Sequence, residues 1–403
     1  GTHEKTQEGG PGGMKLLLLS SSTGGGHDMR ARSFAQWATV PGTCEFTVTR
    51  HQALENNGLL YAFGAGLYNW IQRVWPTLHH IYFNVLEFVP FCGSTTAMPG
   101  RRAFAEYIRG ERPDIVLSTH DHLNHAFLKA AREALPEHPP LCGTYCGELA
   151  GGYGFSRHWV NPEADFFIGA VDACTEQARR LGMAPEKSWT GGFMLNPDFW
   201  STPLSADGRA ALLRDELHLD PARFTLLLGT GANGANNHRA LLDALDRAGV
   251  HPQIIALCGR NDGARRGVEA WAAAHPQIPV CALGYQERMR RIMECADAIF
   301  ARPGTGTTSE AIISGLPVIF NGIGGVMPQE IITTRYCRRF FETNIVRSVT
   351  VLPRVVARWM ARPDCLAQIR AGVAQARPGG HPARILERLA ALRTRQIHGG
   401  TSK

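Results

Sequence analysis

Residues 15–38, KLLLLSSSTGGGHDMRARSFAQWA, decide the fold class, because an apolar run leads through a glycine-rich loop into a helix-like segment. The same order returns at residues 224–245, FTLLLGTGANGANNHRALLDAL. Continuous apolar strands with helical crossovers are typical of parallel sheets that carry helices on both faces. The sequence therefore predicts an α/β protein with two Rossmann-like domains that face each other across a cleft. Ligands in such sheets bind beyond the carboxyl ends of the strands, where both glycine loops fall.

Further apolar runs extend each half into a sheet. Additional strands are expected at residues 44–50, 114–120 and 141–147 in the first half, and at 252–259, 279–285, 298–302 and 316–321 in the second. The segment 195–206, which contains Pro197 and Pro203, separates the two series. We therefore expect a flexible tail at residues 1–13, an N-terminal domain at 14–198, a C-terminal domain at 199–380, and a final helix and tail at 381–403.

The composition provides ample material for packed cores. Of the 403 residues, 44% are hydrophobic and 19% are charged, which excludes a disordered chain. Lys and Arg number 42 against 35 Asp and Glu, for a net charge of +7. This surplus suits phosphates or an acidic membrane surface but is too small to require nucleic acid, so no nucleic-acid partner is expected. Without a signal peptide or an apolar span of 18 residues, we expect a cytoplasmic protein, attached at most to the membrane periphery.

The ten cysteines are scattered along the chain, and several lie inside apolar runs. Only Cys142 and Cys146 are close together, and their C-x3-C spacing has no second pair to complete a zinc site. Buried free thiols in a reducing compartment are therefore favoured over disulfides or a metal site.

The first glycine loop, Thr23–His27, is a candidate anion site, because its backbone can approach a ligand and a helix N-terminus follows. It does not match G-x-G-x-x-G, and the next strand ends in Arg50 rather than an acidic residue, which argues against a dinucleotide dehydrogenase. No Lys-Ser or Lys-Thr follows the glycines, which excludes a Walker A loop. A purely structural turn is the alternative. The loop residues expected to contact a ligand are Gly25, Gly26, Gly229, Thr230 and Gly231.

A third segment, RPGTGTTSE at residues 302–310, carries the more informative signal. It places hydroxyls and free N–H groups at the start of a helix, which suits a diphosphate. Glu310 falls one turn into that helix, where a carboxylate can accept hydrogen bonds from two ribose hydroxyls. Gln329 and Glu330, at the start of the next helix, are expected to contact sugar hydroxyls. The alternative is an N-capped core helix in which Glu310 only favours the helix dipole.

In their order along the chain, the TGGGH loop, residues 302–310 with their SGLPVIF continuation, and PQE at 328–330 resemble a known group. They are similar to the monogalactosyldiacylglycerol synthases and bacterial diacylglycerol glycosyltransferases, and more distantly to the peptidoglycan enzyme that adds N-acetylglucosamine to lipid I. The resemblance covers most of residues 14–345, including LYNWIQRVW at 67–75 and HWVNPEAD at 158–165. It implies a GT-B fold, a UDP-sugar donor held mainly by the C-terminal domain, and an inverting transfer without a bound metal.

Carried over by position, the resemblance assigns the donor contacts. Glu310 would hold the ribose, Gln329 and Glu330 the transferred sugar, and Gly229–Gly234 would close over the phosphates. The remaining donor contacts, mainly to the diphosphate, are Arg302, Gly304, Thr305, Gly306, Thr307 and Thr308. The sequence has no D-x-D pair to hold a divalent ion, so we expect neither a metal nor another cofactor. Helix N-termini would then meet the charge on the leaving UDP.

Inversion by a single displacement requires a base that takes the proton of the acceptor hydroxyl. His27 is the first candidate, because it follows the N-terminal glycine loop and the ordinary histidine pKa suits the task. The alternative is that His27 only caps its helix or contacts phosphate. Glu148 is the second candidate, although the similar lipid glycosyltransferases tend to have Thr-Asp where this chain has Gly147-Glu148. The cluster His120-Asp121-His122 is expected to be a polar strand end, with orientation of a base or acceptor binding as the alternative.

Residues 58–91 concentrate aromatic side chains, broken by Arg73, His79 and His80. Such a segment is typical of a membrane interface, with Trp and Tyr at headgroup depth and cations near lipid phosphates. Arg101 and Arg102 would strengthen the attraction to an anionic membrane surface. The alternative is an ordinary pair of core helices. The enzymes that this chain resembles admit their lipid through a segment of this kind.

Together these features predict a glycosyltransferase that moves a hexose or hexuronic acid from a UDP-sugar to the hydroxyl of a diacylglycerol-like membrane lipid. A prenyl-phosphate or phosphoglycerate lipid is an alternative acceptor, which the basic net charge mildly favours. A UDP-N-acetylglucosamine 2-epimerase shares the architecture, but residues 58–91 argue against it. A non-catalytic membrane protein that binds nucleotide sugars is the third class.

Overall fold

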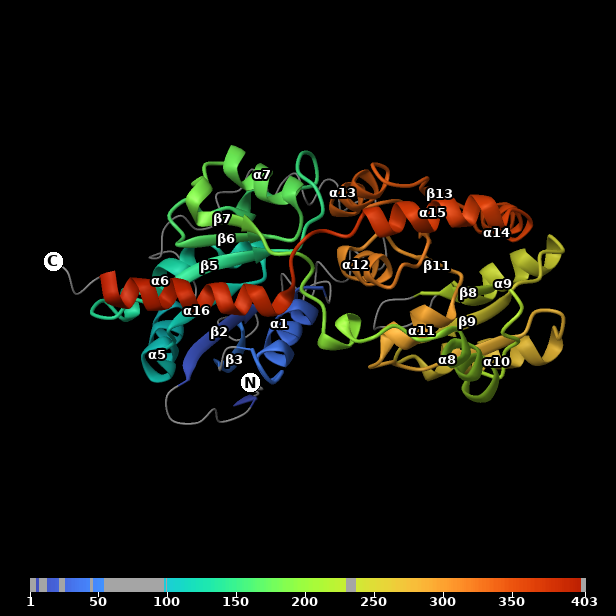
Figure 1. The fold of residues 1–403 in the computed structure, drawn as a ribbon, viewed down its shortest axis with the longest axis horizontal. Coiled ribbons are helices and arrows are strands. Elements are labelled where there is room, and N and C mark those ends of the chain that lie inside the picture. Colours follow the sequence, from blue (N-terminus) through green and yellow to red (C-terminus); the bar gives the residue numbers. More distant parts are fainter. Residues whose placement is uncertain are drawn as a thin grey trace. The chain divides into compact units, whose positions relative to one another are not determined.

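The computed structural model describes residues 5–6, 13–21, 26–43, 46–53, 98, 100–229 and 237–399. The chain divides into two compact units (Figure 1). The first unit comprises Gly1–Pro197, Met327–Ile332 and Pro378–Lys403, and the second comprises Asp198–Val326 and Thr333–Arg377. The aromatic segment at residues 58–91, which we predict to lie at a membrane, falls outside the described residues.

The first unit is built on a sheet with the strand order β1-β3-β2-β4-β5-β6-β7. The two-residue strand β1 (Lys5–Thr6), inside the expected tail, pairs antiparallel with β3, and the other strands run parallel. These are β2 (Met14–Ser20), β3 (Phe46–Gln52), β4 (Ile115–Ser118), β5 (Leu141–Cys146), β6 (Phe166–Gly169) and β7 (Ser188–Thr190). Because β2 lies between β3 and β4, its leucines Leu16–Leu19 are buried, as expected for a central parallel strand.

Helices of the first unit come from both ends of the chain. They are α1 (Gly26–Trp37), α5 (Arg101–Glu111), α6 (Ala126–Ala134), α7 (Asp172–Arg180), α16 (Pro382–Gly399) and the short turns η2 (Asp121–Leu123), η3 (Arg157–Trp159) and η4 (Pro185–Lys187). Helix α16 contacts α1 and returns the end of the chain to this unit (Figure 1). Its Ile385 packs against Gly191, where an added Cβ would lie 2.8 Å from Ile385 Cδ1.

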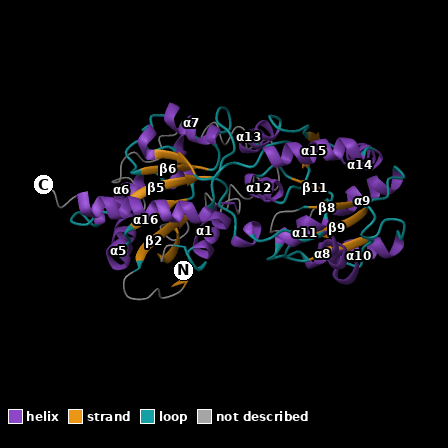
Figure 2. Cartoon of the chain, viewed as in Figure 1, coloured by secondary structure: helices purple, strands orange, loops and turns teal. Residues whose placement is uncertain are grey.

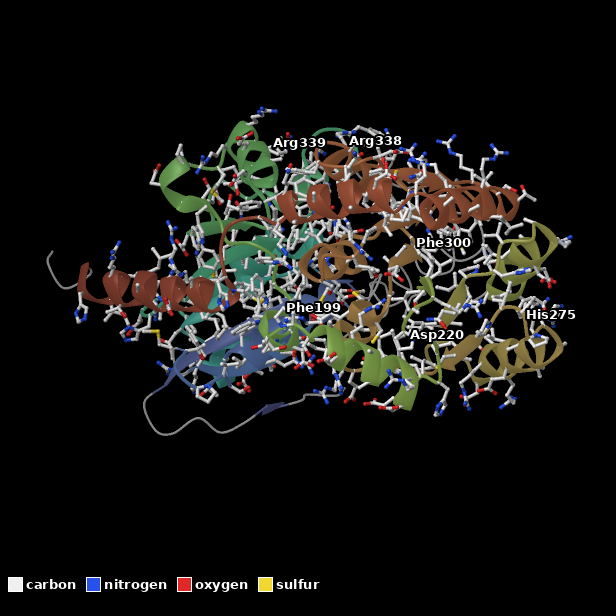
Figure 3. All side chains as sticks on the ribbon, turned by 45° about the vertical axis from the view of Figure 1, so that its right-hand side comes forward. Phe199, Asp220, His275, Phe300, Arg338 and Arg339 are labelled. Carbon is white, nitrogen blue, oxygen red and sulfur yellow. The ribbon has the colours of Figure 1, made fainter. Side chains whose placement is uncertain are left out.

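The second unit has a parallel sheet with the strand order β10-β9-β8-β11-β12-β13 (Figure 2). Its strands are β8 (Thr225–Leu228), β9 (Gln253–Leu257), β10 (Val280–Leu283), β11 (Ala298–Ala301), β12 (Val318–Asn321) and β13 (Asn344–Val346). Phe300 of the central strand β11 is almost fully buried in this core (Figure 3). The unit thus repeats the architecture of the first with its own apolar centre.

Helices follow the strands of the second unit in alternation. They are η5 (Pro197–Trp200), α8 (Ala206–Ala211), the π-turn η6 (Leu212–Glu216), α9 (His238–Arg247), α10 (Asp262–Ala274), α11 (Met289–Cys295), α12 (Thr305–Ile313), α13 (Pro328–Cys337), η7 (Val349–Val351), α14 (Leu352–Ala361) and α15 (Pro363–Gln375). The first residues of α13 belong to the first unit and its later residues to the second.

The predicted fold class, an α/β protein with two Rossmann-like parallel sheets, is confirmed. Each expected strand is present, whereas β1, β6, β7 and β13 were not expected. The eight cysteines within the described ranges are free thiols, as predicted, and Cys44 and Cys92 fall outside them. None of the helices that the structure describes is long and apolar enough to cross a membrane.

Candidate functional site

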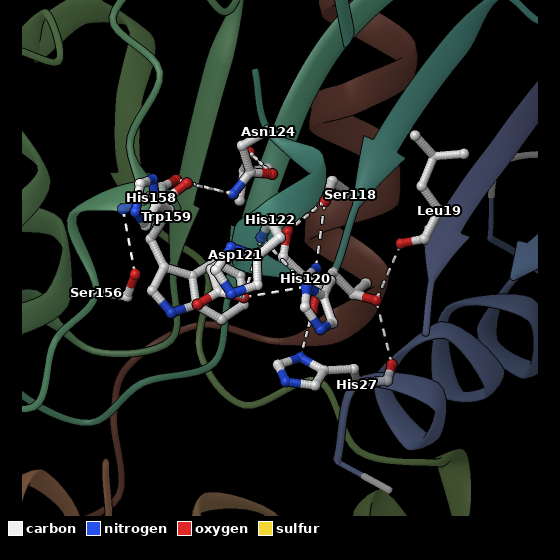
Figure 4. Close-up of polar contacts among 12 residues, drawn as sticks. Leu19, His27, Ser118, His120, Asp121, His122, Asn124, Ser156, His158 and Trp159 are labelled. Carbon is white, nitrogen blue, oxygen red and sulfur yellow. Dashed lines mark hydrogen bonds and ion pairs between the residues drawn. The ribbon is translucent and has the colours of Figure 1, made fainter. Parts of the chain in front are cut away.

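In the first unit, the carboxyl ends of β2 and β4 bring His27 and Thr119 together (Figure 4). Gly26 begins α1 and His27 follows it, whereas Gly25 lies outside the described residues. His27 Nδ1 lies 2.7 Å from the carbonyl oxygen of Thr119. Because a carbonyl oxygen only accepts hydrogen bonds, this contact assigns the proton to Nδ1 and leaves the lone pair on Nε2.

His27 is neutral at physiological pH. Burial lowers its pKa to about 3, His120 and Arg30 act in the same direction, and Asp121 opposes them. The imidazole of His120 lies 4.4 Å from that of His27, measured between ring centroids. The expectation that His27 keeps an ordinary histidine pKa is therefore wrong, because its surroundings make the imidazole a weak base.

Asp121 is the charged centre of the histidine cluster that follows β4 (Figure 4). Its Oδ1 lies 3.0 Å from His120 Nδ1 and 3.9 Å from His122 Nε2. Burial opposes ionisation, but His122 and His120 hold the pKa of Asp121 well below its usual range. Among the residues that the structure describes, no group of three or more His, Cys, Asp or Glu side chains is placed to hold a metal ion. The cluster is a hydrogen-bonded polar strand end with one permanent negative charge.

Glu148 follows β5, the strand next to β4, at the same edge of the sheet. Its side chain is buried, and Oε2 has no hydrogen-bond partner among the described residues. Burial raises the pKa of Glu148 to about 7, Arg30 opposes this shift, and Asp121 adds to it. A buried carboxyl group with one oxygen that lacks a described hydrogen-bond partner, and with a pKa near neutrality, is suited to exchange a proton with a substrate.

The loop after Glu148 contacts the start of α13 within the first unit. Gly154 has a φ of +96°, and an added Cβ would lie 2.1 Å from the carbonyl oxygen of Pro328. Only a residue without a side chain fits here, because the backbone conformation and the close approach both exclude a Cβ. The PQE motif at 328–330 therefore packs against the loop that carries Glu148.

The two sugar-reading candidates at 329–330 have different surroundings. Glu330 is buried, and its Oε2 accepts a hydrogen bond from the Met327 backbone nitrogen at 2.8 Å. This carboxylate caps the N-terminus of its own helix, as in the reciprocal half of a capping box. Gln329 is partly exposed, and its Nε2 lies 3.7 Å from Met327 Sδ. Helix capping thus accounts for one contact of Glu330, and Gln329 lies on the first turn of the same helix.

In the second unit, α12 begins directly beyond β11, with Gly304 as its N-cap residue. The Thr308 nitrogen donates to the Gly304 carbonyl oxygen at 3.1 Å and makes the first bond of the helix. The backbone nitrogens of Gly306 and Thr307 precede that bond, so they have no partner within the helix. An added Cβ on Gly304 would meet no atom within 4 Å, so open space adjoins the helix start. Of the predicted residues, Gly306 and Thr307 therefore offer backbone donors at the start of the helix, next to this open space.

Glu310 lies in the second turn of α12. Burial raises the pKa of its carboxyl group to about 7. Its side chain makes no hydrogen bond or ion pair in the described part of the chain. The carboxylate is thus available to a ligand with hydroxyl donors.

Arg302 supports the neighbouring loop. Its guanidinium donates to the carbonyl oxygens of Ile323 and Gly325, at 3.0 Å and 2.8 Å. Both carbonyls follow β12, so Arg302 links the end of β11 to the segment that leads into α13. These bonds indicate that Arg302 shapes the site. Its guanidinium is engaged by the two carbonyl oxygens and is not held free for a phosphate.

Of the second glycine loop, the structure describes Gly229, while Thr230 and Gly231 lie outside the described residues. The Gly229 nitrogen donates to the Phe300 carbonyl oxygen at 2.8 Å, which joins the end of β8 to β11. An added Cβ at this position would lie 3.0 Å from the Cβ of Ala301. Close strand packing therefore explains the glycine at 229.

Sequence reasoning missed Arg30, a buried guanidinium on α1. Its Nη2 donates to the Gly147 carbonyl oxygen at 3.2 Å. A basic residue on a helix gives no signal by itself, because most arginines are exposed. The sequence feature that relates to this contact is Gly147, because a glycine leaves room for a long side chain from another element.

Comparisons with known proteins agree with this arrangement. No protein-family model matches the chain. A probable monogalactosyldiacylglycerol synthase 3 of Oryza sativa subsp. japonica is 25% identical over 381 residues, which cover 90% of this chain and 71% of the relative. The processive diacylglycerol beta-glucosyltransferase of Bacillus subtilis strain 168 is 22% identical over 324 residues, or 76% of each chain. The chain spans 65–71% of the length of the rice and tobacco synthases that it matches.

Solved structures support the fold. Acinetobacter baumannii MurG superposes with a TM-score of 0.59 at 15% identity, covering 94% of this chain and 99% of MurG. Anabaena HepE in complex with UDP has a TM-score of 0.51 at 11% identity, covering 97% of this chain and 100% of HepE. The predicted resemblance is therefore confirmed: the chain is related to the monogalactosyldiacylglycerol synthases and bacterial diacylglycerol glucosyltransferases, and its fold is the GT-B glycosyltransferase fold.

Proposed function

We propose that this protein is an inverting, metal-independent glycosyltransferase that moves a hexose or hexuronic acid from a UDP-sugar to the hydroxyl of a diacylglycerol-like membrane lipid. The observation that carries the proposal is the Glu310 carboxyl group, half-buried and without a hydrogen-bond partner among the described residues, on the helix that begins beyond β11. A carboxyl group that is partly withdrawn from water is stabilised by hydrogen-bond donors, and two ribose hydroxyls would supply them. The relatives' names, monogalactosyldiacylglycerol synthase and diacylglycerol beta-glucosyltransferase, supply the reaction class and the acceptor.

The donor diphosphate is proposed to bind at the first turn of α12. The unused backbone N–H groups and the positive end of the helix dipole both favour an anion there. Gly304 leaves the approach open, and Arg302 fixes the adjoining loop through Ile323 and Gly325. When the bond to the sugar breaks, negative charge grows on UDP, and these prearranged donors stabilise it without a metal ion.

Proton transfer at the acceptor hydroxyl is proposed to fall to Glu148. The acceptor oxygen attacks the anomeric carbon opposite the leaving UDP, its proton passes to a Glu148 oxygen, and the configuration inverts. A pKa of about 7 gives Glu148 both a substantial ionised fraction and adequate basicity at neutral pH. His27 is the second candidate base, with its lone pair on Nε2 and a much lower pKa. This assignment reverses the order expected from the sequence.

The transferred sugar is proposed to contact Gln329, while Glu330 holds the helix start on which Gln329 stands. Association with an anionic membrane at the cytoplasmic surface is proposed for residues 58–91, on the strength of their sequence. Such a surface also suits the alternative acceptors, prenyl-phosphate or phosphoglycerate lipids.

The test is a panel of UDP-sugars incubated with the protein, EDTA and vesicles that contain diacylglycerol, followed by mass spectrometry and NMR of the lipid product. We expect one sugar to appear on the lipid with its anomeric configuration inverted, and E148Q to lose most of this activity. Isomerised UDP-sugar in the absence of lipid would instead identify an epimerase. Binding of UDP without turnover on any lipid would identify a nucleotide-sugar-binding protein.

A further inference from the structure

The guanidinium of Arg30 fills space that a side chain at position 147 would need. Arg30 is 4% exposed, and its Nη2 donates to the Gly147 carbonyl oxygen at 3.2 Å. A Cβ added to Gly147 would lie 2.0 Å from Arg30 Nε and 2.1 Å from Cζ. Non-bonded atoms cannot approach so closely. The Arg30 guanidinium can therefore occupy this position only when residue 147 is glycine.

A buried guanidinium is unfavourable unless an anion compensates it. Glu148 directly follows Gly147, and the positive charge of Arg30 lowers the pKa of its carboxyl group. From the 3-10 turn η2, Asp121 acts on Glu148 with the opposite sign. Two charges from separate elements thus act on Glu148: Arg30 lowers the pKa of its carboxyl group and Asp121 raises it.

Three further titratable groups, on β5 and α1, are uncharged at neutral pH. On β5, burial raises the pKa of Tyr145 and Cys146 above their usual ranges, so the phenol and the thiol stay protonated. On α1, burial keeps His27 neutral. Beside the larger effect of burial, Arg30 and Asp121 are thus the charges among the described residues that shift the pKa of Glu148.

We propose that Arg30 is a positioning residue of the acceptor side, whose guanidinium lies against the Gly147 backbone and so places a positive charge near the Glu148 carboxyl group. Gly147 and Arg30 act as one unit in this role, because the missing side chain admits the guanidinium. The catalytic role of Arg30 rests on the proposed function. Its effect on the ionisation of Glu148 concerns the protein without substrate and does not depend on that function.

The test is a titration of Glu148 in the full chain labelled with [13Cδ]glutamate, with the resonance assigned by its absence in E148Q. In R30Q we expect the pKa of Glu148 to rise by at least about one unit, which leaves about tenfold less carboxylate at a given pH below it. R30K restores the positive charge and should return the titration toward that of the wild type. The acid limb of kcat/KM should move with the titration in each variant.

Matched controls separate this effect from general damage to the fold. G147A, which displaces the guanidinium, should raise the pKa of Glu148 as R30Q does. G143A, on β5, places a Cβ 2.4 Å from the Phe166 carbonyl oxygen of β6 and should lower the melting temperature without moving the titration. R393Q removes another buried arginine, which bonds to the Pro139 carbonyl oxygen, and should behave like G143A.

An unchanged Glu148 titration in folded R30Q, or in G147A where R30Q does not fold, overturns the inference. If the wild type transfers no sugar yet the titration moves, the proposed function fails and the role of Arg30 stands. If sugar is transferred and the acid limb of R30Q matches the wild type, the proposed function stands and the inference fails.

Discussion

His27 and Thr119 hold each other at two points. The His27 Nδ1 lies 2.7 Å from the Thr119 carbonyl oxygen, and the Thr119 hydroxyl donates to the His27 carbonyl oxygen at 3.1 Å. This pairing fixes the imidazole in one tautomer and ties the start of α1 to the end of β4. Burial keeps this ring neutral and the pairing keeps it rigid, which leaves proton uptake near neutral pH to another group.

The pH profile of sugar transfer should identify that group. A general base works only when deprotonated, so with Glu148 as base kcat/KM should fall as the pH drops through about 7. E148Q should lower kcat by about 10²- to 10⁴-fold, the usual contribution of a general base. Steady-state rates between pH 4 and 9 provide the measurement. An activity that persists down to about pH 4 and survives in E148Q would place the base at His27, whose pKa is about 3.

Glu148 should also make stability depend on pH. Its pKa rises from 4.5 to about 7 on folding, so its favourable contribution is complete below pH 4.5 and is lost as the pH rises through 7. At pH 8, E148Q should therefore raise the free energy of unfolding by about 3 kcal/mol, with little change at pH 4. Urea denaturation at the two pH values measures this. The exposed E163Q serves as the control and should change neither value. Equal stability of E148Q and the wild type at pH 8 would contradict this prediction, because it would show that the ionised Glu148 carboxylate does not destabilise the folded protein.

UDP affinity should depend on Glu310. Hydrogen bonds to a charged group contribute about 1.5–3 kcal/mol, so E310A should weaken UDP binding by roughly tenfold to a hundredfold. Isothermal titration calorimetry with UDP provides the measurement. E216Q alters an exposed carboxylate paired with Arg291 at 3.7 Å and should bind UDP like the wild type. Unchanged UDP affinity of E310A would show that the ribose does not bind at this helix.

The contact of Gly154 with Pro328 should transmit changes to the sugar-reading helix. G154A combines a left-handed backbone at φ +96° with a collision at the Pro328 carbonyl oxygen. G249A has a φ of +65° and meets no atom within 4 Å, so it carries only the backbone strain of about 1–2 kcal/mol. We expect G154A to lower the melting temperature more than G249A and to raise the KM for UDP-sugar. Equal effects of the two substitutions would mean that the loop accommodates the added carbon.

Much of the fold could be predicted from apolar runs. Leu16–Leu19 and Leu226–Leu228 announce central strands, because only a strand covered on both faces is apolar throughout. The strands β6, β7 and β13 have three or four residues each, and runs this short lack a distinct period. They form because neighbouring strands and helices provide their partners, which local sequence does not reveal.

The candidate site was predictable only in part, for a similar reason. The glycine loops and the start of α12 gave a local signal, since a strand, a turn and a helix adjoin in the sequence. The contacts of Thr119 with His27 and of Arg30 with Gly147 join residues 92 and 117 positions apart. They depend on strand order, and they decide the pKa values on which the choice of base depends. The cap at Glu330 likewise required the geometry of Met327.

The return of α16 to the first unit sets an order of events during synthesis. Arg393 bonds to the Pro139 carbonyl oxygen at 2.9 Å and lies 3.4 Å from Asp114, 279 positions earlier in the chain. Every residue of the second unit leaves the ribosome before this helix does. The first unit to be translated is therefore the last to be completed, and a fragment that ends at residue 197 lacks two of its segments, Met327–Ile332 and Pro378–Lys403.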